Sequence, residues 1–169
     1  MTQLMDVLGS RYPIIQGPVG ELNDPKMVAA VSEAGALGML ALGFATDLAR
    51  IKKLIDEVKD LTDKPFGANL MIAMNPHNEA ILELLAEAGI KLVTTSAGSP
   101  KKIYSKIKEL GMKALHVTLA APLAVKAAEA GAAGVVVSGL ESGGLRTNGP
   151  ELTNMVLVPL VCDMVDVPV

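Results

Sequence analysis

The stretch from Glu129 to Gly139 reads Glu-Ala-Gly-Ala-Ala-Gly-Val-Val-Val-Ser-Gly and contains the unit that indicates the fold. Its opening residues are typical of a helix end, where glycine adopts the left-handed conformation that turns the chain back. The three valines that follow predict a buried strand. The unit recurs upstream, each time followed within a few residues by an apolar run, as Glu33-Ala34-Gly35, Glu87-Ala88-Gly89 and Glu109-Leu110-Gly111.

Helix and strand therefore alternate along the chain. Strands are predicted near residues 13–16, 37–42, 66–69, 91–95, 113–118 and 134–138, and a seventh begins at 167–169. Regular alternation predicts an α/β protein with a parallel sheet covered by helices. An open doubly wound sheet and a (β/α) barrel both satisfy this pattern. No linker or low-complexity segment interrupts it, so residues 1–169 are expected to form one domain.

Composition narrows the function classes. Half of the 169 residues are hydrophobic but only four are aromatic, so the core must be aliphatic. The net charge is −3, and no basic patch with interleaved aromatic residues predicts nucleic-acid binding. Cys162 is the single cysteine, which argues against disulfides. No signal peptide or membrane-spanning run is recognisable, so a cytoplasmic protein with a small-molecule substrate is expected.

Polar side chains follow the predicted strands at their carboxyl ends, where parallel α/β proteins bind ligands. In strand 113–118 the pairs Leu115/Val117 and His116/Thr118 occupy opposite faces. The apolar pair is expected to face the helices, so His116 should point into the barrel interior or sheet mouth. The polar residues at strand ends are Gln16, Asn69, Thr94, Thr95, Ser96, His116, Thr118 and Ser138.

Each of these residues also has a purely structural interpretation. Gln16 and Asn69 could cap neighbouring backbone groups instead of binding a ligand. A buried histidine such as His116 is more often a satisfied core residue than a catalyst. Glu141, in the Gly-rich loop after residue 138, could act as a base or be a solvated charge. His77 is expected at the surface and Cys162 in the packing, and no residues have the spacing of a metal site.

Several segments resemble the nitronate monooxygenase (2-nitropropane dioxygenase) family and, more distantly, the FMN-dependent type II enoyl-acyl-carrier-protein reductases. The similarity covers essentially the whole chain, in order. Its segments are Arg11-Tyr12-Pro13-Ile14-Ile15-Gln16-Gly17-Pro18, residues 29–38, Phe66-Gly67-Ala68-Asn69-Leu70, residues 93–100, residues 129–132 with the valines that follow, Glu141-Ser142-Gly143-Gly144 and Leu157-Val158-Pro159.

The resemblance implies a (β/α)₈ TIM-barrel fold that holds FMN at its carboxyl face. By position, Gln16, Gly17 and Pro18 would line the flavin edge and Asn69 would hydrogen-bond the isoalloxazine or ribityl region. Gly143 and Gly144 would present their amides near the cofactor. Flavin chemistry would then be the cofactor's own, with the protein supplying orientation, hydrogen bonds and exclusion of water.

The chain departs from the family at the residue after the paired glycines. The family usually has a histidine there at the reactive flavin face, whereas this chain has Leu145. Leucine can neither donate a hydrogen bond nor move a proton. The catalytic residue is therefore unassigned, and the replacement candidates are Arg146 in the same loop and His116.

Length is the second departure, because a (β/α)₈ barrel needs about 250 residues. About six βα units are present and the seventh strand only begins, before the family's phosphate-binding loops. The chain thus resembles an incomplete barrel that is a fragment, is completed by another chain, or forms a homo-oligomer through its open sheet edges. The expected activity is FMN-dependent oxidation of nitronates or similar small substrates. The alternatives are enoyl-thioester reduction and a non-catalytic half-barrel that binds a partner.

Overall fold

The computed structural model describes residues 2–20, 22–144 and 152–169 of the chain. Within these residues, five parallel strands form one sheet in the order β1-β2-β3-β4-β5. The strands are β1 (Gly38–Ala41), β2 (Phe66–Met71), β3 (Leu92–Ser96), β4 (Lys113–Thr118) and β5 (Gly134–Val137). Each strand pairs with the next one along the chain, which is the connectivity of a (β/α) barrel wall.

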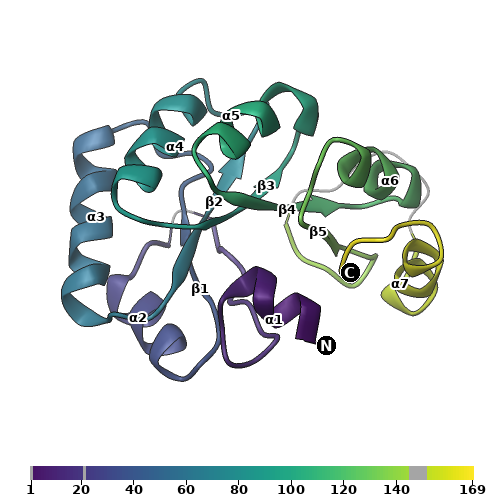
Figure 1. Cartoon of the computed structure of the whole chain (residues 1–169), viewed down its shortest axis with the longest axis horizontal. Helices are drawn as coiled ribbons and strands as arrows, with labels where there is room; N and C mark the ends of the chain where they lie inside the picture. The colour runs from purple at the N-terminus through teal and green to yellow at the C-terminus, as the bar shows by residue number, and fades with distance from the viewer. Residues whose placement is uncertain (1, 21, 145–151) are drawn as a thin grey trace.

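Helices connect the strands and lie in an arc outside the sheet (Figure 1). They are α2 (Pro25–Glu33), α3 (Leu48–Leu61), α4 (Asn78–Glu87), α5 (Tyr104–Glu109) and α6 (Ala121–Glu129), with a 3₁₀ turn, η1 (Pro100–Lys102), before α5. The first helix, α1 (Thr2–Leu8), precedes the arc, and α7 (Asn154–Cys162) follows β5. Asp24 caps α2, where its side chain accepts a 3.0 Å hydrogen bond from Lys26 N.

Two hydrophobic clusters lie on opposite faces of the sheet, and they show which type of α/β fold the chain has. Helices α2 to α7 pack on one face, through residues such as Val28, Ile55 and Leu82, against the strand residues Leu40 and Val93. A smaller cluster on the other face joins Leu37, Met39, Leu92 and Leu115 with Leu8 of α1. Since the connecting helices cover only one face, the sheet is part of a (β/α) barrel wall and not an open doubly wound sheet.

The helix-ending glycines behave as the repeated unit predicts. Gly35, Gly89, Gly111 and Gly131 all have positive φ angles, between 67° and 98°. Residues with a Cβ rarely adopt this conformation. Each glycine therefore reverses the chain at the end of a helix and directs it into the next strand, which confirms the expected role of the unit.

The first predicted strand, residues 13–16, is mostly wrong as a strand. It makes a single parallel bridge, between Ile15 and Leu37. Beyond that bridge, side chains replace backbone along the edge of β1. Met39 N donates to Gln16 Oε1 (3.3 Å), and Asn23 pairs with both the N–H and the C=O of Ala41 (2.7 and 2.8 Å). The edge of β1 is thus covered by two side-chain amides instead of a regular strand.

The predicted seventh strand is likewise not formed as a regular element. Residues 167–169 have no strand assignment. One contact of the expected kind is present, because Val135 N donates to Pro168 O at 2.9 Å. This part of the chain therefore runs beside the start of β5, as a further barrel strand would, without extending the ladder.

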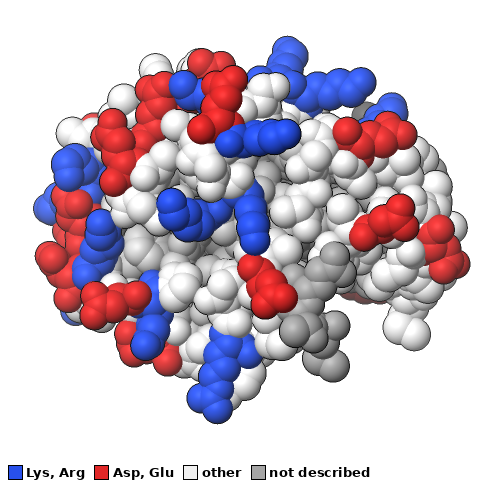
Figure 2. Space-filling view, in the orientation of Figure 1, with Lys and Arg blue, Asp and Glu red and all other residues white. Residues whose placement is uncertain are grey.

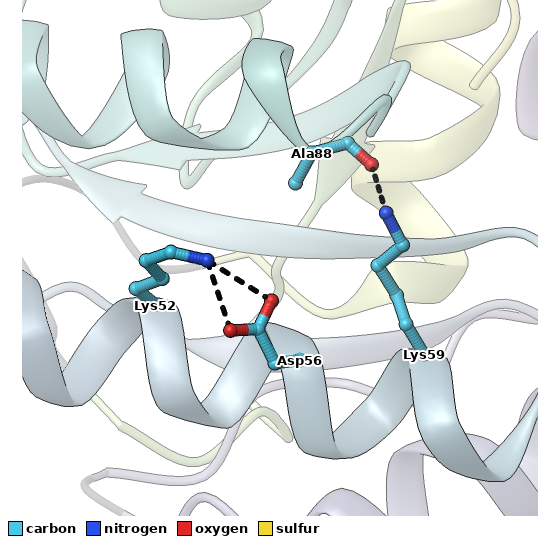
Figure 3. Close-up of polar contacts among 4 residues, drawn as sticks. All are labelled: Lys52, Asp56, Lys59 and Ala88. Atoms are coloured by element: carbon cyan, nitrogen blue, oxygen red, sulfur yellow. Dashed lines mark hydrogen bonds and ion pairs between the residues drawn. The ribbon is translucent and has the colours of Figure 1, made fainter.

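Charged side chains are concentrated on the helices. On the face shown in Figure 2, basic and acidic groups intermingle over α3 and α4, whereas the charged groups near α7 are few and acidic. Lys59 of α3 crosses to α4, where its Nζ donates to the carbonyl of Ala88 at 3.0 Å (Figure 3). Lys52 and Asp56 form an exposed pair within α3 at 2.9 Å, a type of contact that contributes little stability.

Candidate functional site

The centre of the candidate site is an amide–hydroxyl pair at the carboxyl ends of two neighbouring strands. Asn69 of β2 and Thr94 of β3 lie opposite each other in the parallel register. Asn69 Nδ2 donates to Thr94 Oγ1 at 3.1 Å, and both side chains are buried. Alternation along β3 places Thr94 on the same face as Leu92, which belongs to the inner cluster. The pair therefore faces the barrel interior.

The oxygen of the Asn69 amide is available to a ligand. Within the described residues, no hydrogen bond reaches Asn69 Oδ1, although the side chain is only 8% exposed. Gly43, after β1, borders this oxygen, since a Cβ added at Gly43 would lie 3.3 Å from Oδ1. An acceptor held in a fixed orientation beside a residue without a side chain suits a donor group such as an imide N–H or a hydroxyl.

Gln16 is engaged at the edge of β1. Its Oε1 accepts from Met39 N, and its Nε2 donates to Gly17 O. The Gln16 side chain therefore caps backbone groups, which was the structural interpretation of this residue. Gly17 is exposed and Pro18 half-buried, and a Cβ at Gly17 would meet no atom within 4 Å. Space for a ligand therefore remains beside Gly17.

His116 faces the opposite way from the predicted direction. Leu115 belongs to the inner cluster with Leu37, Met39 and Leu92, whereas His116 packs on the helix side against Tyr104 of α5. The expectation failed because the sheet is apolar on both faces, so alternation shows which residues share a face but not which face is inner. His116 is thus separated from Asn69 and Thr94 by the sheet itself.

On the helix side, His116 belongs to a buried polar cluster with Thr95 and Tyr104. Thr95 Oγ1 lies 2.9 Å from His116 Nδ1 and 3.0 Å from the Tyr104 hydroxyl. Burial lowers the pKa of His116, and burial raises the pKa of Tyr104 to about 12 against the opposing hydrogen bond from Thr95. Both groups are therefore held neutral, which fits a satisfied core cluster.

The segment after β3 has an unusual backbone. Ala97 has a φ angle of +51°, a conformation that residues other than glycine seldom adopt. Hydrogen bonds from Ile72 N to Ser96 O (2.9 Å) and from Ala73 N to Ala97 O (2.8 Å) hold it there. A Cβ at Gly98 would lie 2.8 Å from Ile72 Cβ, so the close approach requires glycine. This well-anchored segment borders the candidate site at the end of β3.

The glycines of the loop after β5 stand in open space. Gly143 and Gly144 are exposed, and a Cβ at either would meet no atom within 4 Å. Gly144 has a φ angle of +94°, which favours glycine. Leu145, which takes the place of the family's usual histidine, and the replacement candidate Arg146 both lie outside the described residues.

Other residues singled out in the sequence have structural positions. His77 is exposed, as expected, whereas Cys162 is exposed at the end of α7 and does not pack in the core. Glu141 accepts hydrogen bonds from Asn154 N at the start of α7, so its carboxylate is neither a free base nor an unpartnered charge. Sequence inspection also missed Asn75, whose Nδ2 bonds the carbonyls of Leu42 and Ala45.

A hollow of about 600 Å³ lies at the other end of the strands, beside α1. Two of its lysines are already engaged, because Lys59 Nζ donates to Ala88 O and Lys113 Nζ to Asp6 O. Both carbonyl groups lie at the carboxyl ends of helices, α4 and α1, where a positive charge is favourable. The inward-facing polar pair lies at the carboxyl ends instead, and we assign the candidate site there because parallel β/α units bind ligands at that end.

The described part of the chain, residues 2–20, 22–144 and 152–169, contains no group of three His, Cys, Asp or Glu side chains that could hold a metal ion. None of the helices in these ranges is long and apolar enough to span a membrane. The arrangement offers hydrogen bonds and close backbone approach to a neutral or anionic organic group. It therefore defines a partial (β/α) barrel with a candidate ligand site at its carboxyl face.

Comparison with known proteins identifies the family. The nitronate monooxygenase family matches residues 1–169, so this chain belongs to that family. A dehydrogenase of Rhodococcus jostii (strain RHA1), named for (3aS,4S,5R,7aS)-5-hydroxy-7a-methyl-1-oxo-octahydro-1H-indene-4-carboxyl-CoA, is 34% identical over 170 residues, which cover 99% of this chain and 46% of that protein. A probable nitronate monooxygenase of Staphylococcus saprophyticus is 26% identical over 99% of this chain and 59% of its own length.

Solved structures confirm the barrel. FabK from Thermotoga maritima superimposes with a TM-score of 0.89 at 36% identity, over 98% of this chain and 52% of FabK. A nitroalkane oxidase from Streptomyces ansochromogenes superimposes with a TM-score of 0.86 at 24% identity, which supports the fold alone. The chain thus spans about half the length of the relatives that it matches.

Proposed function

We propose that this chain forms the flavin-contacting half of an FMN-dependent oxidoreductase of the nitronate monooxygenase type. The observation that carries the proposal is the inward-facing Asn69 amide, which is fixed by Thr94 and has an oxygen that no described residue uses. Family membership over the whole chain supports it. When bound, FMN would supply the transfer of electrons between substrate and acceptor.

The residues present fit such a cofactor. Asn69 Oδ1 would accept a hydrogen bond from a ring imide or ribityl hydroxyl, while Thr94 keeps the amide in orientation. The open amides of Gly143 and Gly144 and the uncovered backbone at Gly17 allow close approach of a planar group. Gln16 would contribute by fixing this backbone at the edge of β1, because its side-chain amide is engaged there.

His116 has no role in this proposal, because the sheet separates it from the inner face. A proton-transfer residue for the reactive centre is therefore left unassigned. The identities of substrate and acceptor therefore depend on parts of the site other than the Asn69–Thr94 pair.

Reduction of enoyl thioesters is the second candidate function. Its support is the 36% identity to FabK, an FMN-dependent enoyl-acyl-carrier-protein reductase. The two candidates share the cofactor and differ in the substrate. Turnover with a nitronate and with an enoyl thioester plus a nicotinamide donor would distinguish them.

Titration of the purified 169-residue chain with FMN tests the shared part of the proposal. We expect quenching of flavin fluorescence, and we expect Asn69→Ala to weaken binding about tenfold, as loss of a well-aligned hydrogen bond to a buried group does. His77→Ala, which changes an exposed residue of a neighbouring loop, should bind as the unaltered chain does. A chain that takes up no FMN at high micromolar concentration would contradict the proposal.

A further inference from the structure

The Gly-rich loop after β5 is closed at its base by a hydrogen-bonded clasp formed by Gly139, Glu141 and Asn154. Asn154 N donates to both carboxylate oxygens of Glu141, at 3.0 and 2.9 Å. In return, Asn154 Oδ1 accepts from Gly139 N at 2.7 Å. The three residues thus join the beginning of the loop to the first turn of α7 across 13 to 15 positions of sequence.

Backbone contacts draw the two arms of the loop together at the same place. Leu140 N donates to Leu152 O at 2.8 Å, and Ser142 N donates to Gly139 O at 3.0 Å. The arms before and after residues 142–151 therefore lie side by side. Gly143 and Gly144 follow directly on the tied arm, so their placement depends on where that arm is held.

The clasp requires glycine at position 139. A Cβ there would lie 2.6 Å from both Asn154 N and Asn154 Oδ1, and 2.7 Å from Glu141 Oε2. These contacts are far shorter than van der Waals separation, and they involve the same atoms that form the clasp. Close packing therefore explains why residue 139 is a glycine, and no role in ligand binding is needed to explain it.

Glu141 also serves α7 as a cap supplied from outside the helix. The residue at the N-cap position, Thr153, makes no side-chain capping bond. The Glu141 carboxylate instead accepts from the N–H of the first helical residue, Asn154. A negative charge is favourable at a helix N-terminus. The energy of capping α7 is therefore coupled to the position of the loop.

We propose that Glu141 is a positioning residue that holds the paired glycines of this loop in place for the cofactor. The inference rests on the proposed function for its flavin part, since Gly143 and Gly144 are the groups that would approach FMN. It goes beyond that function by giving the loop carboxylate a mechanical role instead of a proton-transfer role. Without the clasp, the glycines would sample many positions, and binding of FMN would have to restrict them.

Two measurements on the full 169-residue chain test this inference. Trypsin cleaves after Lys and Arg, and residues 142–153 contain one such residue, Arg146. We expect Glu141→Ala to accelerate cleavage after Arg146 at least fivefold, with cleavage after Lys59 in α3 as the internal reference for global unfolding. Glu141→Gln keeps one carbonyl acceptor for Asn154 N, so it should restore much of the protection. Glu129→Ala, which removes an exposed carboxylate from α6, is the matched control.

The second measurement is the dissociation constant for FMN of the same variants. We expect it to rise about tenfold in Glu141→Ala, less than threefold in Glu141→Gln and not at all in Glu129→Ala. Equal trypsin rates in Glu141→Ala and the unaltered chain would overturn the anchoring role. Faster cleavage with unchanged FMN affinity would overturn the positioning role.

Failure of the proposed function gives a different pattern. If the unaltered chain binds no FMN, the flavin part of the inference falls with the proposed function. The trypsin rates still decide whether Glu141 anchors the loop, because that measurement needs no cofactor.

Discussion

The face of the sheet on which a polar side chain lies decides its surroundings in this molecule, as shown by Asn69, Thr95 and His116. All three are buried polar residues near the carboxyl ends of their strands. Asn69 points inward and keeps an acceptor for a ligand, whereas His116 points to the helices and is bonded to Thr95. Their chemistry is therefore divided between a candidate binding site and a structural cluster.

Buried His116 predicts a loss of stability in acid. Burial lowers its pKa in the folded chain, so the unfolded chain binds the proton more readily. Stability should be unaffected above the ordinary histidine pKa of about 6.5 and should fall as the pH decreases below it. Thermal unfolding between pH 7.5 and 5 measures this effect. His116→Gln should have a shallower acid slope than the unaltered chain, and His77→Gln should keep the original slope.

The raised pKa of Tyr104 predicts a loss of stability at alkaline pH. Its pKa is raised to about 12, so the unfolded chain loses the phenolic proton first. Stability should decline as the pH rises from about 10 to 12, by a total of roughly 2–3 kcal/mol. Tyr104→Phe should make this decline smaller and cost about 1 kcal/mol at neutral pH for the lost hydrogen bond. An alkaline decline of the same size in Tyr104→Phe and the unaltered chain would contradict the assignment.

The order of helices and strands follows from the sequence because the unit is repeated and its turn chemistry is specific. Each Glu-Ala-Gly or Glu-Leu-Gly triplet ends a helix at a glycine with positive φ. The five central strands consequently begin and end within two residues of their predicted bounds. The segment at 13–16 could not be distinguished from a strand, because its composition is apolar. Only the contacts of Gln16 and Asn23 show that side chains, and not a neighbouring strand, bond the edge of β1.

The candidate site was predictable only in part. Asn69 could be chosen as a candidate from its place near a strand end, since the carboxyl ends of parallel strands are where ligands bind, and its ligand role stays a prediction. The face of His116 could not be found, because both faces of a parallel sheet are apolar. The role of Glu141 could not be found either, because its partner lies 13 residues away and is reached only through the fold.

Gly38 of β1 lies very close to the backbone of α2, and a side chain at this position would not fit. A Cβ at Gly38 would lie 2.2 Å from Val28 O, and backbone cannot give way as a flexible side chain can. Gly38→Ala should therefore lower the free energy of unfolding by about 2–4 kcal/mol. Gly17→Ala, where a Cβ would meet nothing within 4 Å, should change it by less than about 0.5 kcal/mol. Urea titration of both variants measures the difference, and equal midpoints would contradict the packing.

At the scale of the whole molecule, α7 is packed on one side only. It buries Leu157 and Val161 against the rest of the chain. Several of its other apolar residues stay exposed, including Met155 at 84% and Val156 at 52%. Exposed apolar clusters of this kind mark contact surfaces. The apolar face of α7 is therefore a candidate contact surface.

The exposed face of α7 predicts self-association of the isolated chain. We expect light scattering after size exclusion to show a mass above 17.5 kDa that increases with protein concentration. Met155→Glu should shift the population toward the monomer, because it places a charge in the apolar face. Met74→Glu changes another exposed methionine, away from α7, and should leave the association intact. A monomer at every concentration would contradict the prediction.

The contacts of α1 also determine when this helix can fold into place during synthesis. Leu8 packs with Leu92 and Leu115, and the carbonyl of Asp6 accepts from Lys113 across 107 residues of sequence. During synthesis, α1 leaves the ribosome well before its partners, because its binding surface is complete only when β4 has emerged. At roughly 5–20 residues per second, α1 waits at least several seconds for these partners. This helix is thus made long before it can reach its native position, and until then the inner face of the growing sheet is open at that end.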